Sequence, residues 1–285
     1  MLLAVLSWAF ANTIVKIAHV QAVSFAFYRL WLGSAIMVFV LLLLRRRVGL
    51  DIFRRAAPGG LLFGLNIVFF FSAIRLTSIA DVLVIGALQP ALTLLVAGPL
   101  FEERVGLRGA LLVGVSIAGV LLVTIGSSGT PVWSLRGDIF AALALLAWTA
   151  YFIVSKLVRV RMRTIEYMTA VTVIGALVVT PIALLSGQPL GNLRLQDWLW
   201  LLVFLAGAQG GHLLIAWAHP QVDVSISSLL ILAEPIVGAV AAFLVLDEPI
   251  TSLMMVGAVV VVSAIGWLLW LATRTRRVEI REPQT

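Results

Sequence analysis

The stretch SISSLLILAEPIVGAVAAFLVLDEPI, from Ser225 to Ile250, decides how we interpret this chain. It is long and apolar enough for a membrane-spanning helix, yet it carries an acid, Glu234, and a proline, Pro235, near its middle. A charge inside a membrane costs about 2.5–3.5 kcal/mol on insertion scales and marks a functional site by default. A mid-helix proline removes a backbone donor and crowds the carbonyl four residues earlier, here that of Ile231. Such interruptions are tolerated in lipid only where protein or water satisfies the freed groups, so the stretch predicts a polar interior.

A second stretch, ADVLVIGALQPALTLLVAGPLFEERV, aligns with the first at a shift of 145 residues. Few positions are identical, but the proline, its polar neighbour and an acidic pair keep their spacing. The matched positions are Pro90 with Pro235, Gln89 with Glu234, and Glu102-Glu103 with Asp247-Glu248. Polar, proline-interrupted segments at corresponding places in two halves of a chain are typical of a transporter binding site. We therefore predict helix breaks at Pro90 and Pro235.

Composition places the whole chain in the membrane. Of its 285 residues, 62% are hydrophobic and 12% are charged, whereas a soluble domain carries about 25% charged residues. One span needs about 20 apolar residues, so the length allows about ten spans and no soluble domain. Cysteine is absent, which excludes disulfides and thiolate metal sites. We predict an all-α integral membrane protein of ten transmembrane helices.

The apolar segments fall into two units of five. The start of the sixth segment repeats the first at a shift of 140: Trp8 and Lys16 match Trp148 and Lys156. An odd number of spans per unit puts the two copies in opposite orientations across the membrane, which is an inverted repeat. We predict one repeat over residues 1–126, the second over 136–273, and a polar tail over 274–285. The predicted spans are 2–20, 24–44, 58–76, 80–102, 107–125, 137–157, 165–185, 198–218, 225–250 and 253–272.

The basic residues predict the orientation. With a cytoplasmic N-terminus, fifteen of them fall in the cytoplasmic loops and tail, and five, Lys16 and Arg29 among them, lie at the outer ends. This bias is the positive-inside rule, so we expect both termini in the cytoplasm and the protein in a bacterial-type inner membrane. The net charge of +7 is thereby explained without a nucleic-acid partner. We expect a small-molecule substrate and the lipid bilayer as partners, and a monomer or a weak homodimer.

Polar and aromatic residues at mid-span depth are the candidates for a central cavity. Glu234 is a partner for a substrate amine, a carrier of a proton or ion, or an acid held only by packing. The others are cavity-lining groups or interhelical hydrogen-bonding and packing groups. The predicted cavity set is Glu234, His212, Gln209, Asn66, Gln89, Trp148, Trp8 and Ser228. His212 and Gln209 are three residues apart and are expected to share one helix face.

The sequence gives little indication of a metal site or of an enzyme active site. The histidines are scattered and there are no cysteines, so we expect no metal, and no nucleophile motif or phosphate loop is present. The glycines are expected to let helices approach closely, with Gly114 and Ala118 forming one small-residue contact and Gly238 and Ala242 another. The acidic pairs at the helix ends are expected to act as a clamp or a gate.

These motifs together resemble the drug/metabolite transporter superfamily, EamA type. The resemblance rests on the early tryptophan and lysine of each half, FYRLWLG with Arg29, and LQP and AEP in the fourth spans. The last of the shared features is an acidic pair before a glycine-spaced final span. The subgroup that the chain resembles is the bacterial aromatic amino-acid exporters of the YddG kind, although Arg29 has no basic counterpart near Glu166-Tyr167.

The resemblance implies an inner-membrane exporter of amino acids and related small metabolites. The inverted repeat and the paired proline breaks indicate alternating access, and we expect no cofactor. Spans one to four and six to nine would form the central cavity. The alternatives are an exporter of other metabolites or drugs in the same superfamily, a membrane-embedded enzyme, or a channel. No catalytic residues are expected.

Overall fold

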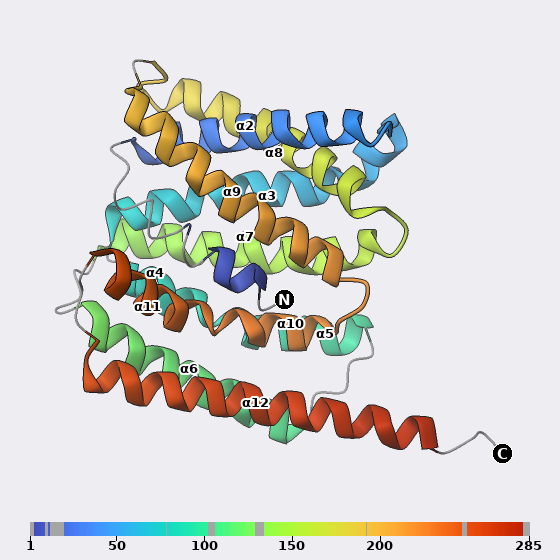
Figure 1. The fold of residues 1–285 in the computed structure, drawn as a ribbon, viewed down its shortest axis with the longest axis vertical. Coiled ribbons are helices and arrows are strands. Elements are labelled where there is room, and N and C mark those ends of the chain that lie inside the picture. Colours follow the sequence, from blue (N-terminus) through green and yellow to red (C-terminus); the bar gives the residue numbers. More distant parts are fainter. Residues whose placement is uncertain are drawn as a thin grey trace.

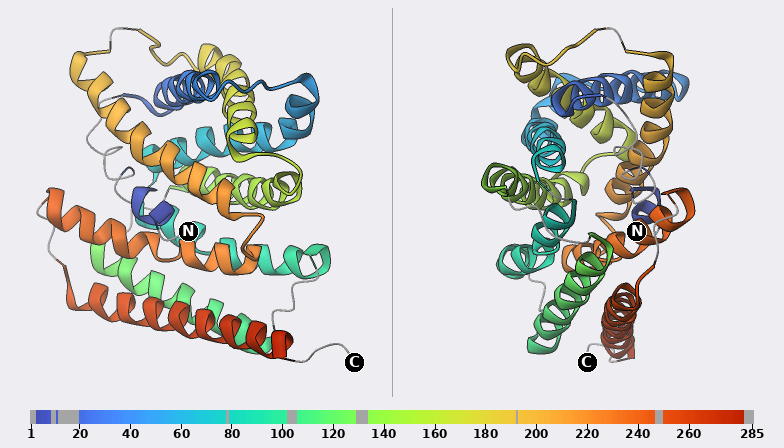
Figure 2. Two further views of the ribbon diagram at one scale, coloured as in Figure 1. Left: turned by 45° about the vertical axis from the view of Figure 1, so that its right-hand side comes forward. Right: turned by 90° about the vertical axis from the view of Figure 1, so that its left-hand side faces the viewer.

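The computed structural model describes residues 3–8, 11, 20–77, 79–101, 106–128, 134–191, 193–246 and 250–281. Within these residues the regular structure is helical (Figure 1). Long helices lie across one another in layers, and the chain ends in a helix at one edge of the molecule (Figure 2). The acidic pairs Glu102-Glu103 and Asp247-Glu248, and Lys16, lie outside the described residues.

Among the described residues, six helices are long and apolar enough to cross a membrane. They are α2 (Ala22–Leu43), α3 (Leu50–Leu76), α6 (Leu107–Ser128), α7 (Leu135–Arg159), α8 (Thr164–Leu185) and α9 (Leu195–Ala218). Their outward faces carry large apolar side chains, such as Leu42 and Leu185, that are 65% and 87% exposed. Water would not tolerate such a surface, whereas acyl chains match it. The chain is an all-helical, multi-pass membrane protein, and these helices begin and end close to the predicted spans, except that α3 begins well before residue 58.

Two of the predicted spans are broken in the middle. The first consists of α4 (Ile79–Gly86) and α5 (Gln89–Phe101), and the second of α10 (Val224–Ile231) and α11 (Glu234–Leu246). Each bound of α10 and α11 lies 145 residues after the corresponding bound of α4 and α5. The chain runs through the two broken helices in opposite directions, and α10 packs on α5 (Figure 1).

The breaks fall just before the two prolines. A proline disfavours helical dihedrals in the residue before it and has no N–H to donate, so a new helix starts more easily than the old one continues. At the second break, Leu232 and Ala233 instead donate backbone bonds of 3.0 and 3.2 Å to carbonyls three residues earlier, those of Leu229 and Leu230. Short bonds of this kind satisfy the backbone at the interruption.

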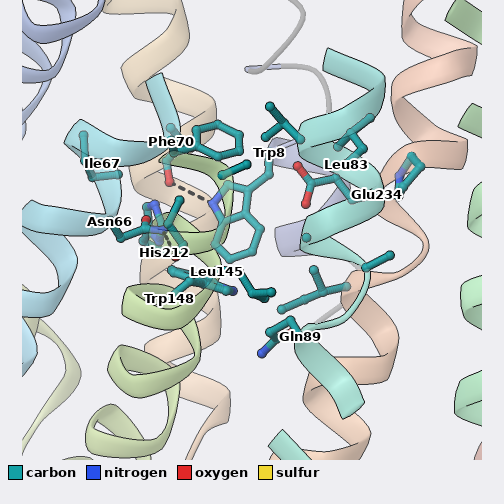
Figure 3. A pocket seen from close by; sticks show the side chains of 18 of the residues that line it. Trp8, Asn66, Ile67, Phe70, Leu83, Gln89, Leu145, Trp148, His212 and Glu234 are labelled. Carbon is teal, nitrogen blue, oxygen red and sulfur yellow. Dashed lines mark hydrogen bonds between the residues drawn. The ribbon is translucent and has the colours of Figure 1, made fainter. Parts of the chain in front are cut away.

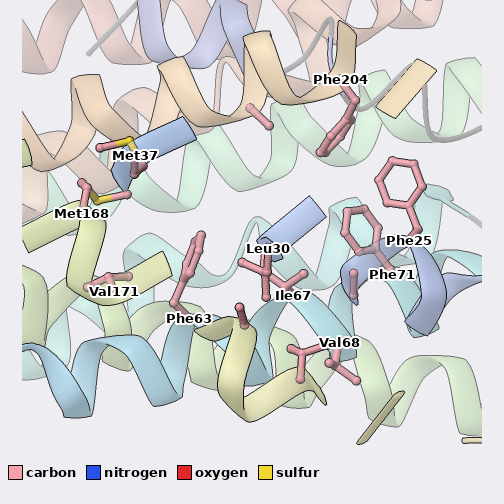
Figure 4. Close-up of a cluster of buried hydrophobic side chains, with 14 of the residues drawn as sticks. Phe25, Leu30, Met37, Phe63, Ile67, Val68, Phe71, Met168, Val171 and Phe204 are labelled. Carbon is pink, nitrogen blue, oxygen red and sulfur yellow. The ribbon is translucent and has the colours of Figure 1, made fainter. Parts of the chain in front are cut away.

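An apolar core joins helices from both halves of the chain. Phe25, Phe71 and Phe204, from α2, α3 and α9, meet edge to face with ring centroids 5.0–6.0 Å apart. Further along, Met37 and Met168 bring α8 into the same cluster (Figure 4). Aromatic edge-to-face pairs add about 0.5–1.5 kcal/mol each beyond their buried area. This core fixes α2, α3, α8 and α9 around the polar groups described below.

The loop after α8 is tied to the start of α2. The side-chain oxygen of Gln188 accepts hydrogen bonds from the backbone N–H groups of Val23 (2.8 Å) and Ser24 (3.3 Å). The Ser24 hydroxyl donates to the carbonyl of Pro189 at 2.8 Å, and the Tyr28 hydroxyl to that of Leu190 at 2.6 Å. The first N–H groups of a helix have no partner within it, so Gln188 caps α2 from a distant part of the chain.

Helices α6 and α12 (Ser252–Arg281) pack along each other at the edge of the molecule (Figures 1 and 2). Their contact is built on Gly119 and Gly257: a Cβ on Gly119 would lie 2.7 Å from Val261 and 3.0 Å from the carbonyl oxygen of Gly257. The predicted contact at Gly114 and Ala118 is wrong, because both are exposed and a Cβ on Gly114 would meet nothing within 4 Å. Gly119 is five residues on, and its side of the helix faces α12.

Three further differences from the prediction concern glycine and helix length. A Cβ on Gly238 would meet nothing within 4 Å, so the second small-residue contact is also not made there. Helix α3 continues through the exposed Pro58 and includes the amphipathic stretch before it, since the carbonyl freed by the proline lies near the helix end. Helix α12 continues to Arg281, so most of the predicted polar tail is helical.

We predict that Gly119→Leu destabilises the protein. The added side chain would push α12 away from α6, and overpacking of this kind costs about 1–3 kcal/mol. The measurement is the midpoint of thermal unfolding in detergent. Gly114→Leu, on the exposed side of the same helix, is the control and is expected to leave the midpoint unchanged. Equal effects of the two substitutions would contradict the placement of α12.

Candidate functional site

A cavity of about 140 Å³ lies between the two broken helices and the long ones. At about 30 Å³ per water molecule this is room for about five waters, or for one solute of roughly the size of benzene. The wall takes residues from the segment 3–8 and from α2, α3, α7 and α9, and it includes both helix breaks (Figure 3). Of the predicted set, the structure brings together Trp8, Asn66, Gln89, Trp148, His212 and Glu234, and Pro235 lines the wall beside Glu234.

The two repeat-related tryptophans form an aromatic part of the wall. Trp8 and Trp148 meet edge to face with ring centroids 5.4 Å apart, and both lie against His212, at 4.8 and 5.8 Å. The indole N–H of Trp8 donates to the carbonyl of Ala208 at 3.3 Å. Trp8 is held closely, because a Cβ on Gly211 would lie 2.4 Å from its indole nitrogen. The missing side chain at Gly211 is thus the space that the Trp8 ring occupies.

Arg29 is a cavity residue outside the predicted set. The charge pattern places it at the outer end of its span, but the structure buries it in α2 with only 6% of its surface exposed, where it lines the cavity. Its guanidinium carbon lies 5.9, 5.5 and 5.1 Å from the ring centroids of Phe63, Phe71 and Phe204. Cation–π contacts of this kind offset part of the cost of burying the charge. The available signal was one basic residue two turns inside an apolar helix, which marks a functional position by default.

Arg29 also fixes the protonation of His212. One of its terminal nitrogens lies 2.8 Å from Nε2 of His212. A guanidinium only donates, so Nε2 must accept, and the ring is the neutral tautomer with its proton on Nδ1. That Nδ1 group is buried without a partner among the described residues. His212 therefore orients a cation and adds no second positive charge beside it.

Glu234 lies on the facing wall. In Figure 3 its carboxyl group is on the other side of Trp8 from His212 and Asn66. It is the first residue of α11, where unpaired backbone N–H groups and the positive end of the helix dipole favour a carboxylate. Its repeat-related partner Gln89 starts α5 in the same way and donates to the hydroxyl of Thr93 at 3.3 Å.

The remaining predicted residues lie differently. Asn66 donates to the carbonyl of Ala144 at 3.0 Å and so joins α3 to α7 at the wall. Gln209 and Ser228 are buried but are not part of the wall, and neither is Pro90. The side-chain oxygen of Gln209 approaches Gly33 of α2 instead, where a Cβ would lie 3.1 Å from it. The cavity side of α9 runs through Ala208 and His212, which are four residues apart. Gln209 follows Ala208 directly and is turned from it by about 100° around the helix.

The site contains no ready arrangement for a metal ion. Across the described residues, no three histidine, aspartate or glutamate side chains lie close enough together to hold one. The wall combines one buried cation, one carboxylate, one imidazole, two amides and two indoles with an otherwise apolar surface. Such a lining suits binding of a small amphiphilic molecule that has polar ends and an apolar body.

The sequence profile of the EamA-like transporter family matches residues 1–125 and 135–270. The chain belongs to the EamA-like transporter family. A solved crystal structure with 19% sequence identity shares its fold, with a TM-score of 0.79 over 96% of each chain. A search of curated proteins found no significant match to the sequence. Members of the EamA-like family, which is part of the drug/metabolite transporter superfamily, are membrane transporters, so the cavity belongs to a transporter fold.

For this EamA-like chain we predict that Gly211→Ala displaces Trp8 and damages the cavity. The new methyl group would overlap the indole, which costs about 1–3 kcal/mol or moves the ring into the cavity. The expected result is a lower thermal midpoint in detergent together with weaker solute binding. Gly210→Ala is the control, since a Cβ there meets nothing within 4 Å. Identical behaviour of the two variants would show that Trp8 does not lie against Gly211.

Proposed function

We propose that this member of the EamA-like family is a secondary transporter that exports amino acids, aromatic ones among them, and related small metabolites. The observation that carries the proposal is the cavity lined by both helix breaks, with Arg29, Glu234 and two tryptophans in its wall. In Figure 3 the ring of Trp8 lies between His212 and Glu234. Backbone that leaves helical geometry at membrane depth is tolerated where it lines a cavity, and half-helix termini are the usual ligands of transported solutes.

The chemistry of the wall fits an amino acid. The carboxylate of Glu234 is suited to a substrate amine, and the faces of Trp8 and Trp148 are suited to an apolar or aromatic side chain. A cavity of about 150 Å³ holds benzene, so the volume of about 140 Å³ suits the ring of an aromatic side chain. This assignment is the one expected of the YddG-like aromatic amino-acid exporters, the subgroup in which we propose to place the chain.

Alternating access is the proposed mechanism, with residues 1–126 and 136–273 as two inverted repeats that rock around the cavity. Support comes from the broken helices, whose bounds agree at a shift of 145 residues and whose chains run in opposite directions. In this proposal the protein lies in a bacterial-type inner membrane with both termini in the cytoplasm, and it works as a monomer or weak homodimer.

One observation favours a second candidate, the export of other metabolites or drugs. Most of the wall is apolar, with Ile67, Phe70 and Leu83 among its residues. A bulky apolar compound without an amine or a carboxylate would also be accepted by such a surface. The two candidates differ in their need for the charged groups, which transport assays distinguish.

The proposal predicts saturable flux of amino acids. The purified protein would be reconstituted into liposomes and tested with a panel of radiolabelled amino acids, with and without a proton gradient. We expect uptake that exceeds the uptake by empty liposomes and that saturates with substrate concentration at a low turnover rate. Flux no greater than in empty liposomes across the whole panel would remove the amino-acid assignment, and flux of apolar drugs alone would favour the second candidate.

We predict that Glu234→Gln changes transport. If Glu234 binds the substrate amine, the loss of a charge-assisted hydrogen bond weakens amine-bearing substrates by about 10- to 100-fold. If it carries a proton, the pH dependence of flux disappears, because glutamine does not titrate. Glu166→Gln is the control, since Glu166 pairs with Arg46 at 3.6 Å and is not part of the cavity wall. Unchanged flux at several pH values would reduce Glu234 to a packing role.

A further inference from the structure

We propose that Arg29 is the anchor for a carboxylate group of the transported solute and that His212 positions it. The site would accept organic carboxylates that carry an apolar or aromatic body, amino acids among them. This inference rests on the proposed function, because it assumes that the cargo binds in the cavity lined by Arg29 and Glu234. It adds a requirement, since a solute that lacks a carboxylate would bind poorly.

Arg29 carries a buried positive charge. A guanidinium always carries its proton and has five N–H donors in a planar fork. Among the described residues, the one hydrogen bond of the Arg29 side chain goes to His212, and no carboxylate forms an ion pair with it. A buried charge without a counter-ion costs several kcal/mol. The site is therefore poised to gain from an anion that arrives from outside.

The surroundings of Arg29 select the kind of anion. Phe63, Phe71 and Phe204 surround the guanidinium, while part of the residue borders the cavity. Aromatic rings hold the cation in place but offer no acceptor, so its donors stay available for a ligand. A planar carboxylate matches the fork with two parallel hydrogen bonds, whereas an amide or an amine does not.

His212 serves as the positioning residue. Its Nε2 accepts from Arg29 at 2.8 Å, and its ring packs edge to face on Phe63 with centroids 4.8 Å apart. The hydrogen bond from Arg29 to this fixed imidazole ring therefore sets the orientation of the guanidinium. A neutral ring is required for this role, because a protonated His212 would repel Arg29 and lose its acceptor.

The facing wall fits the other end of the same solute. Glu234 lies across Trp8 from His212 in Figure 3, and Arg29 is hydrogen-bonded to that histidine at 2.8 Å. A solute whose carboxylate binds Arg29 would direct its other groups toward Trp8 and Glu234. Its apolar body would rest against Trp8 and Trp148, which also line the cavity.

A purely structural role for Arg29 makes a different prediction. If Arg29 only braces α2 against α3 and α9, its loss lowers stability without changing which solutes bind. The decisive readout is therefore the ratio of affinities for two ligands in the same protein variant. Such a ratio is unaffected by a general loss of stability.

The test uses two ligand series on the full-length purified protein. One contains L-phenylalanine, L-phenylalaninamide, phenethylamine and 3-phenylpropionate, and the other contains the corresponding compounds built on L-leucine. Affinity is measured from the ligand-induced rise in thermal midpoint and from calorimetry. We expect the acids to bind at least about tenfold more tightly than their amides, because a charge-assisted hydrogen bond contributes about that much to affinity. Amides that bind as well as acids, or no binding by any acid, would overturn the anchor.

Substitutions then show which residue produces the preference for acids over amides. Arg29→Met is expected to abolish the preference for acids over amides, and Arg29→Lys to retain part of it. Arg159→Met is the matched control: Arg159 is also 6% exposed but donates to the backbone carbonyl of Ala216 and is not part of the cavity wall. That variant should lose stability and keep the preference. A preference for acids that survives Arg29→Met would reject the proposal. If this variant does not fold, the affinities of the wild-type protein for acids and amides decide whether the proposal stands.

His212 is tested through a conservative change. His212→Gln keeps a side-chain acceptor for Arg29 and should preserve most of the preference, whereas His212→Leu should lose it. Equal losses in the two variants would argue that His212 does not act through its acceptor nitrogen.

Flux measurements separate this inference from the transport proposal. Binding of acids that depends on Arg29, without any flux in liposomes, would support the anchor and reject transport. Flux of acids and amides alike, unchanged in Arg29→Met, would support transport and reject the anchor.

Discussion

The organisation of this protein depends on one constraint, the need to satisfy backbone groups where a helix stops inside a membrane. Two spans stop just before Pro90 and Pro235, and each resumes as a new half-helix. The new N-terminus exposes N–H groups that have no partner in the helix, and it carries a partial positive charge. Gln89 and Glu234 occupy these two positions. An acid that would be costly in the middle of a continuous span is thus favourable at the start of a half-helix.

The second determinant of the site is a cation placed on the opposite side. Arg29 is held by three phenylalanine rings and by a histidine that must be neutral to accept its hydrogen bond. The same phenylalanines belong to the main apolar core, so the core that holds α2, α3 and α9 together also fixes the charge. Stability and site geometry are therefore coupled here, and a change in the core would alter the orientation of the guanidinium.

Most of the fold could be predicted from the sequence because apolar length and proline position are local properties. The shift of 145 residues between LQP and AEP anticipated the matching bounds of the broken helices. What could not be predicted is which side of a helix faces which neighbour. Gln209 and His212 are close along α9, yet one faces Gly33 and the other the cavity, and Gly119 rather than Gly114 meets α12. The position of Arg29 could not be predicted for a related reason. The number of charges at the ends of the spans does not show how deeply a side chain is buried, because the packing of neighbouring helices decides this.

The tie between Gln188 and the first turn of α2 has a mechanical consequence. Helix α2 lies in the first half of the sequence, but its start is bonded to the α8–α9 loop and its length packs on α8. Moving α2 with its own half would break these contacts at one end of the bundle. Moving it together with α8 would keep them. In the proposed alternating-access cycle, α2 would therefore move together with α8 and not with the other helices of residues 1–126.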